Sequence, residues 1–358
     1  MMTLPPLTVV APLVAAALLG LAIMLPPSVW LSAFCAAALI AAVLAAVHHA
    51  EVIAHRLGEP FGTLVLALAV TVIEVALILS MMLAGGPTKS ALPRDTIFST
   101  VMIICNGVVG LCLLLGGLRH NEQVFRIEGA STSLATLIAM STLTLVLPTF
   151  TTSSPGPTYT ASQLAFAASM SLLLWVLFVF VQTVRHRGYF LPALYADHED
   201  SHAAPPSDRQ AWGSGALLLV ALVSVVGLAK TLSPRVESVL AAAGAPPAAL
   251  GVAIAMLVLL PETVAALRAA HANRLQTSLN LSYGSALASI GLTIPAVVAA
   301  ALWFDLPLVL GLDAKDLVLL WLTFTVSTFT LALGRTHAMQ GAVHLVIFSA
   351  FVFLAVVP

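Results

Sequence analysis

Two glutamates stand in the middle of long apolar stretches. Glu74 lies within LVLALAVTVIEVALILSMML, residues 64–83, and Glu262 lies within VAIAMLVLLPETVAAL, residues 252–267. A charge at the bilayer centre costs roughly 2.5–3.5 kcal/mol on insertion scales, so a carboxyl group at this depth usually marks an ion or proton pathway. The structural alternative is that each glutamate is protonated and makes one interhelical hydrogen bond.

Two carboxylates that face one cavity would suit a hard cation such as Ca²⁺, which takes oxygen ligands. When the cation leaves, burial and mutual repulsion disfavour two charged carboxylates, so protons replace it. Competition between a cation and protons for the same oxygens is sufficient for exchange. The candidate cation- and proton-binding residues are Thr71, Glu74, Asn106, Glu262, Ser285 and Ser289.

A histidine-rich segment ends the second apolar run. His48, Glu51 and His55 share one helical face, and His49 stands beside them. Three interpretations remain open: a plain interfacial helix end, a cytoplasmic proton-entry or pH-sensing site, and a zinc-binding face. The last would suit an intramembrane metalloprotease, although the order is not HExxH. His344, in the last apolar run, is interpreted as a packing residue.

The composition is that of a polytopic membrane protein. Of 358 residues, 60% are apolar and 8% are charged, against about 25% charged residues in a soluble domain. Uninterrupted apolar runs of about 20 residues predict membrane-spanning helices, whereas barrel strands would alternate apolar and polar residues. The composition excludes soluble enzymes, nucleic-acid binders and disordered chains.

Eleven helices follow from these runs and from the Gly and Pro residues between them. Their predicted ranges are 7–25, 28–57, 60–84, 95–118, 128–148, 161–186, 212–232, 248–271, 277–302, 314–334 and 338–357. An all-α membrane protein of one plus five plus five helices is therefore expected. The predicted parts are an extra N-terminal helix at 1–27, a first repeat at 28–194, an acidic cytoplasmic linker at 195–210 and a second repeat at 211–358.

A repeat with an odd number of helices inserts its second copy upside down. The two glutamate helices would then cross the membrane in opposite directions and meet near the midplane, as in inverted-repeat transporters. Gly and Pro near each glutamate would let both helices break and expose backbone carbonyl groups to the ion.

The distribution of basic residues predicts the orientation of the chain in the membrane. Of the 14 Lys and Arg residues, nine fall on the N-terminal side of the membrane and five on the other. The positive-inside rule then places the N-terminus in the cytoplasm, and a bacterial inner membrane is expected. The linker, YADHEDSHAAPPSDRQ, is interpreted as a flexible connection or as a cytoplasmic cation sensor.

A family resemblance adds to this interpretation. HHAEVIAHRLGEPFGTLVLALAVTVIEVALIL, residues 48–79, resembles the first repeat of the cation/calcium antiporter superfamily, and PETVAALRAAHANRLQTSLNLSYGSALASIGLTIP, residues 261–295, resembles its second repeat. Within that superfamily the chain resembles the calcium/proton exchanger (CAX) group, and there the bacterial Cha-type calcium/proton and sodium/proton antiporters. The resemblance covers nearly the whole chain. It implies a ten-helix core of inverted repeats, with Glu74 and Glu262 binding cation and protons and with Asn106 and Ser285 completing the site.

The chain departs from the family at one point. Many calcium/proton exchangers carry Gly-Asn just before each motif glutamate, whereas residues 69–73 and 257–261 here read AVTVI and LVLLP. Fewer polar ligands favour sodium or potassium exchange over strong calcium coordination.

The predicted function is a secondary antiporter that imports protons and exports calcium or monovalent cations. A cation channel without proton coupling is the main alternative, and no Walker-type loop indicates ATP drive. The expected partners are inorganic cations, protons and the lipid bilayer, with no nucleic acid and no resident cofactor. The sequence makes no prediction of oligomeric state.

Overall fold

The computed structural model describes residues 6–26, 28–57, 61–191, 206–246 and 248–357. Helices dominate this part of the chain. Nine of its helical stretches are long and apolar enough to cross a membrane, and one bent pair raises the number to ten. A further described segment, Leu68–Leu83, is apolar but shorter. The prediction of an all-α polytopic membrane protein is confirmed.

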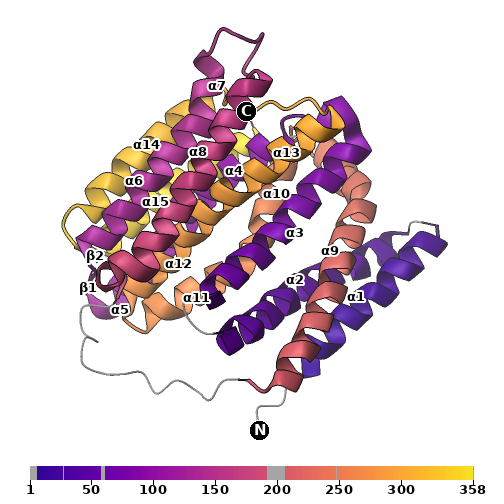
Figure 1. The fold of residues 1–358 in the computed structure, drawn as a ribbon, viewed down its shortest axis with the longest axis horizontal. Coiled ribbons are helices and arrows are strands. Elements are labelled where there is room, and N and C mark those ends of the chain that lie inside the picture. Colours follow the sequence, from indigo (N-terminus) through magenta and orange to yellow (C-terminus); the bar gives the residue numbers. More distant parts are fainter. Residues whose placement is uncertain (1–5, 27, 58–60, 192–205, 247, 358) are drawn as a thin grey trace. The chain divides into compact units, whose positions relative to one another are not determined.

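The chain divides into two compact units. The small unit comprises residues 1–85 and 200–243. Its helices are α1 (Pro6–Met24), α2 (Val29–Leu57), α3 (Phe61–Gly85) and α9 (Asp208–Ala242). Helices α1, α2 and α9 pack against one another, and α3 packs against α2 and α9 (Figure 1).

The large unit comprises residues 86–199 and 244–358. Its first half contains η1 (Gly86–Lys89), α4 (Leu92–Met102), η2 (Ile103–Val108), α5 (Val109–His120), β1 (Glu122–Val124), α6 (Ile127–Ser141), η3 (Thr142–Val146), α7 (Leu147–Phe150), α8 (Ala161–Phe180), η4 (Val181–Arg185) and η5 (Arg187–Phe190). Its second half contains α10 (Ala248–Val258), α11 (Leu260–His271), α12 (Leu275–Ala288), η6 (Ser289–Thr293), α13 (Ile294–Phe304), α14 (Ala314–Leu331), β2 (Arg335–His337) and α15 (Ala338–Val356).

The two short strands of the large unit tie its connecting loops together. β1 pairs antiparallel with β2, with Gln123 opposite Thr336. The buried Gln123 amide donates to the carbonyl oxygen of Ala270 at 2.9 Å and to Asn273 Oδ1 at 3.0 Å. Gly116 leaves the space for this amide, because a Cβ there would lie 1.7 Å from Gln123 Oε1.

Wider, π-helical turns interrupt several spans of the large unit. One of them, η2, joins α4 to α5 and carries Asn106, and another, η6, joins α12 to α13 and begins at Ser289. A π-helical turn shifts the hydrogen-bonding register by one residue and often occurs at functional sites. Both turns fall on predicted site residues.

Helix α9 differs most from its predicted range of 212–232. It begins at Asp208 and continues to Ala242. Ser207 and Gln210 form a reciprocal capping box at its N-terminus. Lys230 and Arg235 are exposed, and Pro234 lies inside the helix without ending it. The predicted range follows the apolar run alone, but an exposed polar extension of a helix needs no apolar face. Residues 195–205 of the predicted acidic linker lie outside the described residues.

The two glutamate helices were both expected to break, and only one does. α10 and α11 meet at a bend of 54°, and Pro261 lies in the first turn of α11. α3 is continuous over its 25 residues. The expectation is wrong for α3 because residues 63–84 contain neither Gly nor Pro.

Candidate functional site

Glu262 lies directly after the bend, in the first turn of α11. Leu259 precedes this helix with φ −84° and ψ −3°. The backbone N–H of Thr263 donates to the Leu259 carbonyl at 2.9 Å, and the Thr263 hydroxyl donates to the same oxygen at 2.7 Å. Negative charge in a first helical turn is stabilised by the helix dipole. The bend therefore places the half-buried Glu262 where a carboxylate is favoured.

The other predicted residues of the large unit lie on elements packed around α11. Helix α11 contacts η2, α5 and α12, and η2 also contacts α12. Asn106 lies on η2 and is fully buried, Ser289 is buried at the start of η6, and Ser285 is half-buried on α12. The fold thus brings the helix of Glu262, the turn of Asn106 and the helix of Ser285 together.

Asn106 is the centre of a buried hydrogen-bond network. Its Nδ2 donates to Thr323 Oγ1 at 2.8 Å, and the Thr323 hydroxyl in turn donates to the Leu319 carbonyl at 2.8 Å. Its Oδ1 accepts from Nδ1 of His344 at 3.1 Å. Nε2 of His344 lies 3.0 Å from Thr330 Oγ1. In a neutral His344, Nδ1 carries the proton and Nε2 accepts from the Thr330 hydroxyl.

This network fixes the orientation of the Asn106 amide. Its NH₂ group faces Thr323 and its oxygen faces His344, which leaves one lone pair of Oδ1 for a further ligand. Sequence reasoning missed the network and interpreted His344 as a packing residue. A signal was available: Thr323, Ser327 and Thr330 follow helical spacing in an apolar run, and all three are buried.

Glu74 and Thr71 belong to the small unit. Both lie on α3, one turn apart, and both are buried, with 1% and 6% of their surface exposed. Helix α3 packs against α2 and α9 within this unit. The predicted meeting of Glu74 and Glu262 stays a prediction, since the two residues belong to different units.

The histidine-rich end of α2 divides into buried and exposed parts. His49 is fully buried; its Nε2 donates to the Thr8 carbonyl at 3.0 Å, and its Nδ1 lies 3.2 Å from Ser214 Oγ. His48 is half-buried with its ring edge-on to that of His49, while Glu51 and His55 are exposed. His49 therefore joins α1, α2 and α9.

The structure gives the zinc-protease alternative no support. Across the described ranges, no three His, Cys, Asp or Glu side chains form a group that could hold a metal ion.

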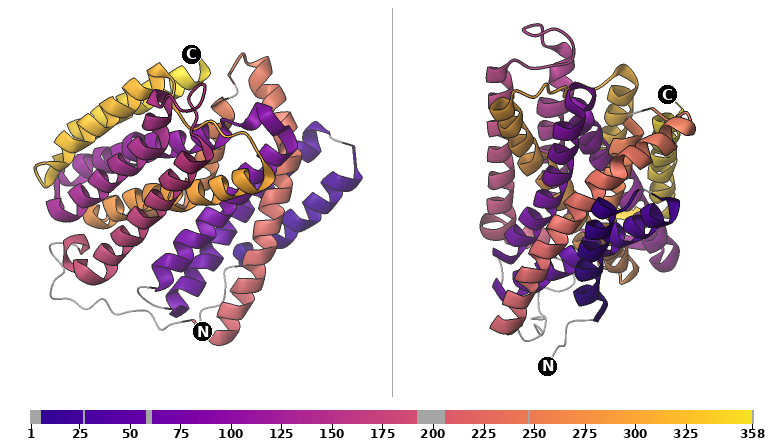
Figure 2. Two further views of the ribbon diagram at one scale, coloured as in Figure 1. Left: turned by 45° about the horizontal axis from the view of Figure 1, so that its top comes forward. Right: turned by 90° about the vertical axis from the view of Figure 1, so that its right-hand side faces the viewer.

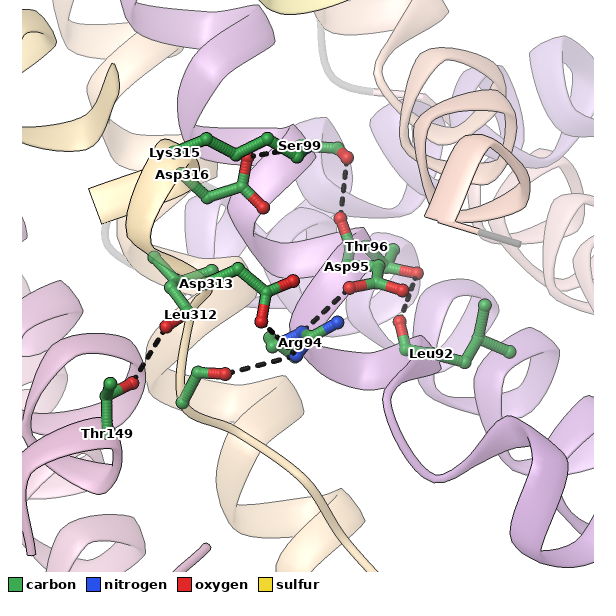
Figure 3. Close-up of polar contacts among 11 residues, drawn as sticks. Leu92, Arg94, Asp95, Thr96, Ser99, Thr149, Leu312, Asp313, Lys315 and Asp316 are labelled. Atoms are coloured by element: carbon green, nitrogen blue, oxygen red, sulfur yellow. Dashed lines mark hydrogen bonds and ion pairs between the residues drawn. The ribbon is translucent and has the colours of Figure 1, made fainter. Parts of the chain in front are cut away.

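A second polar cluster lies where α4 and α14 begin (Figure 3). Arg94 Nε donates to Asp95 Oδ1 at 2.8 Å, and Arg94 Nη1 donates to the Gly311 carbonyl at 3.1 Å and lies 4.0 Å from Asp313 Oδ1. Lys315 pairs with Asp316 at 3.3 Å. The cluster ties the segment before α14 to α4, a role that sequence reasoning did not assign.

Known proteins resemble this chain along most of its length. The family model described as sodium/calcium exchanger protein matches residues 27–184 and 213–357. A relative in Sinorhizobium fredii, named as an ionic transporter (y4hA), is 48% identical over 92% of this chain and 90% of its own. The sodium-potassium/proton antiporter ChaA of Escherichia coli is 33% identical over 87% of this chain and 85% of its own. The solved structure of native YfkE shares the fold, with a TM-score of 0.75 and 19% identity over 98% of this chain and 100% of that one.

Proposed function

The chain belongs to the sodium/calcium exchanger protein family, and from this premise we propose that it is a secondary antiporter that exchanges protons for cytoplasmic cations. The transported cation is calcium, sodium or potassium, all of which take oxygen ligands. The observation that carries the proposal is the pair of glutamates in apolar helices at matching places of the two predicted repeats. A membrane-embedded carboxyl group that alternates between cation and proton needs no other energy source than the proton gradient.

The names of relatives support both monovalent and divalent substrates. The relative at 33% identity is a sodium-potassium/proton antiporter, and two more distant relatives, at 26% and 25% identity, are Ca²⁺/H⁺ antiporters. The loss of Gly-Asn before each motif glutamate favours the monovalent ions. Sodium or potassium is therefore the substrate to test first.

In the proposed mechanism, Glu74 and Glu262 bind the cation or protons but not both. Glu262 is held at the start of α11, where the first-turn N–H groups favour its charged form. Asn106, its orientation fixed by His344 and Thr323, offers one free lone pair of its oxygen. Thr71, Ser285 and Ser289 supply hydroxyl oxygens. Release of the cation leaves the carboxylates to be neutralised by protons.

Alternating access would follow from the inverted repeats. We assign residues 28–194 and 211–358 to the two repeats and 1–27 to an extra helix, as the sequence predicts. The charge distribution supports a bacterial inner membrane with the N-terminus in the cytoplasm. The His48–His55 segment then lies at the cytoplasmic face, where its exposed members could collect protons.

The test is cation-triggered proton flux in proteoliposomes that contain the purified chain and an internal pH dye. Wild-type protein should move sodium, potassium or calcium uphill when a pH gradient is imposed, which a channel cannot do. Each of the variants Glu74→Gln and Glu262→Gln should abolish the flux, because an amide can neither carry the proton nor balance the cation's charge.

Glu122→Gln is the matched control. Glu122 is an exposed carboxylate on β1 that lies 3.9 Å from Arg335, and its loss should leave flux unchanged. Undiminished flux in both Glu74→Gln and Glu262→Gln would refute the assigned site. Cation movement that only dissipates gradients would instead favour a channel.

A further inference from the structure

An apolar groove runs between α1 and α9 of the small unit. Its lining residues are Leu19, Ile23, Leu222, Val223, Val226, Gly227, Lys230 and Thr231. Lys230 is the cationic member, and the others, apart from Thr231, are apolar or glycine. Helices α1 and α9 pack against each other within the small unit (Figure 2).

The groove forms where the two helices approach closely. Gly227 permits this approach, because a Cβ at that position would lie 2.4 Å from Cδ2 of Leu19. Val223, one turn earlier on α9, is 68% exposed. The groove is therefore closed at its base and open along its outer side.

Contacts among α1, α2 and α9 indicate how deep in the membrane the groove lies. At one end, His49 joins Thr8 to Ser214. Further along, Leu19 meets Gly227, so α1 and α9 run in the same direction. Residues 210–229 of α9 carry no charge, and 20 helical residues span about 30 Å, the thickness of the hydrocarbon layer. Lys230 consequently lies at a membrane surface, with the apolar groove extending from it into the hydrocarbon layer.

The Lys230 side chain has no acidic partner among the residues that the structure describes. It is exposed, and no hydrogen bond or ion pair joins it to the residues that the structure describes. Arg56 and Lys315, by contrast, are paired with Asp208 and Asp316. An unpaired ammonium group at the surface level of the bilayer attracts lipid phosphate.

We propose that this groove binds one anionic phospholipid, with an acyl chain lying along Val223, Val226 and Leu19 and the phosphate on the Lys230 ammonium group. The depth of the groove selects a lipid, because a water-soluble anion would reach Lys230 but not the apolar lining. The bound lipid would fill the open side of the α1–α9 contact and hold the extra N-terminal helix against α9.

The test is native mass spectrometry of the purified full-length chain in detergent, titrated with phosphatidylglycerol and, separately, with phosphatidylcholine of identical acyl chains. Wild-type protein should bind one phosphatidylglycerol with a clear preference over phosphatidylcholine. Lys230→Gln should weaken phosphatidylglycerol binding roughly fivefold, the effect of one basic residue at the surface, and leave phosphatidylcholine binding unchanged. Val223→Phe should block the groove and weaken both lipids.

Two matched controls come from the same helix. Arg235 is also exposed and basic but does not line the groove, and Leu219 is 65% exposed and also outside it. Arg235→Gln and Leu219→Phe should therefore bind both lipids as wild type does. The proposal is overturned if Lys230→Gln behaves like Arg235→Gln or if Val223→Phe leaves lipid binding intact. It is also overturned if the wild type gives lipid-free dimers that Val223→Phe dissociates, because the groove would then hold a second copy of the chain.

Discussion

The helices that carry Glu74 and Glu262 occupy matching places in the sequence and differ in shape. α3 is an uninterrupted helix of 25 residues, whereas α10 and α11 meet at a bend of 54°. The residue before the glutamate is Ile73 in the first and Pro261 in the second. A proline lacks the N–H that would bond to the carbonyl four residues earlier and clashes with that carbonyl.

Proline alone does not explain the bend. Pro12 and Pro234 lie inside α1 and α9 without dividing them. What distinguishes Pro261 is that the helices on its two sides pack on different neighbours. α10 packs on α4, where a Cβ at Gly251 would lie 2.8 Å from the Asp95 backbone, while α11 packs on α12 and α5. The proline weakens the joint, and these two sets of contacts set its direction.

The difference in shape gives the two carboxylates different surroundings. In the interior of a continuous helix the backbone N–H groups are used by carbonyls one turn earlier, so Glu74 depends on side chains for polar contacts. Glu262 lies in a first turn, where N–H groups are less completely used and the dipole favours negative charge. The two carboxylates therefore differ in the backbone N–H groups within their reach.

The largest expected effect comes from making α3 resemble α10–α11. Ile73→Pro removes a hydrogen bond from the interior of α3, which is a continuous helix. The free energy of unfolding should fall by about 3 kcal/mol more than it does in Ile73→Ala. Ile73→Ala is the needed comparison, because Ile73 is 2% exposed and its truncation alone is costly.

The measurement is the midpoint of thermal unfolding in detergent, read from the loss of the monodisperse chromatographic peak. Equal midpoints for Ile73→Pro and Ile73→Ala would mean that α3 tolerates a break at this position, and the comparison between the two helices would fail.

The reverse change, Pro261→Ala, should make α10–α11 resemble α3. Alanine restores the N–H group and favours a straighter helix, so the protein should remain folded with an unchanged or higher unfolding midpoint. Exchange should fall about tenfold, a barrier increase of about 1.4 kcal/mol, because Glu262 would no longer lie in a first turn. The assay is the initial rate of cation-triggered proton flux in proteoliposomes.

Pro12→Ala is the matched control for this change. It removes a proline from inside a continuous apolar helix that carries no glutamate, and it should leave the exchange rate near that of the wild type. If Pro261→Ala also exchanges at the wild-type rate, the bend is a consequence of packing and contributes nothing to transport.

The same contrast shows what a sequence can predict about this molecule. The apolar runs predict the helices, and Glu74 and Glu262 are prominent because charges are rare in those runs. Pro261 predicts a weak point in its helix. The bend itself depends on what α10 and α11 pack against, which no local pattern contains. The partnership of Asn106 with His344 spans 238 residues of the chain, so single-sequence spacing does not show it.

At the C-terminal end of α9 the sequence predicts too short a helix. The apolar run predicts a helix that ends at residue 232, yet the helix continues to Ala242, with Lys230 and Arg235 inside it. Charged residues end an apolar run because they leave the hydrocarbon layer, not because they cannot be helical. Membrane boundaries and helix boundaries are therefore separate predictions, and only the first follows from hydropathy.

The smallest expected effect concerns the amide oxygen of Asn106, which lies on the same unit as Glu262. The π-helical turn η2 carries Asn106, which is oriented by the buried His344 and by Thr323. The other π-helical turn, η6, begins at Ser289, which offers a hydroxyl instead of an amide. His344→Leu removes the donor to Asn106 Oδ1 and leaves a buried carbonyl oxygen without its hydrogen bond, which should lower the free energy of unfolding by about 1–3 kcal/mol.

A purely structural role for His344 would stop at that loss of stability, so the transport constants decide between the two interpretations. If the Asn106 oxygen binds the cation, loss of the His344 hydrogen bond lets the Asn106 amide rotate. His344→Leu should then raise the KM for the cation roughly threefold, a binding loss of about 0.7 kcal/mol, with little change in kcat. His344→Gln, whose amide can still donate to Asn106 Oδ1, should recover most of the affinity.

Ser349→Ala on the same helix is the control, since that hydroxyl is exposed and bonds only to the Leu345 carbonyl. An unchanged KM in His344→Leu, despite lowered stability, would remove Asn106 from the cation site and leave Glu262 with the serine hydroxyls as the ligands on its side.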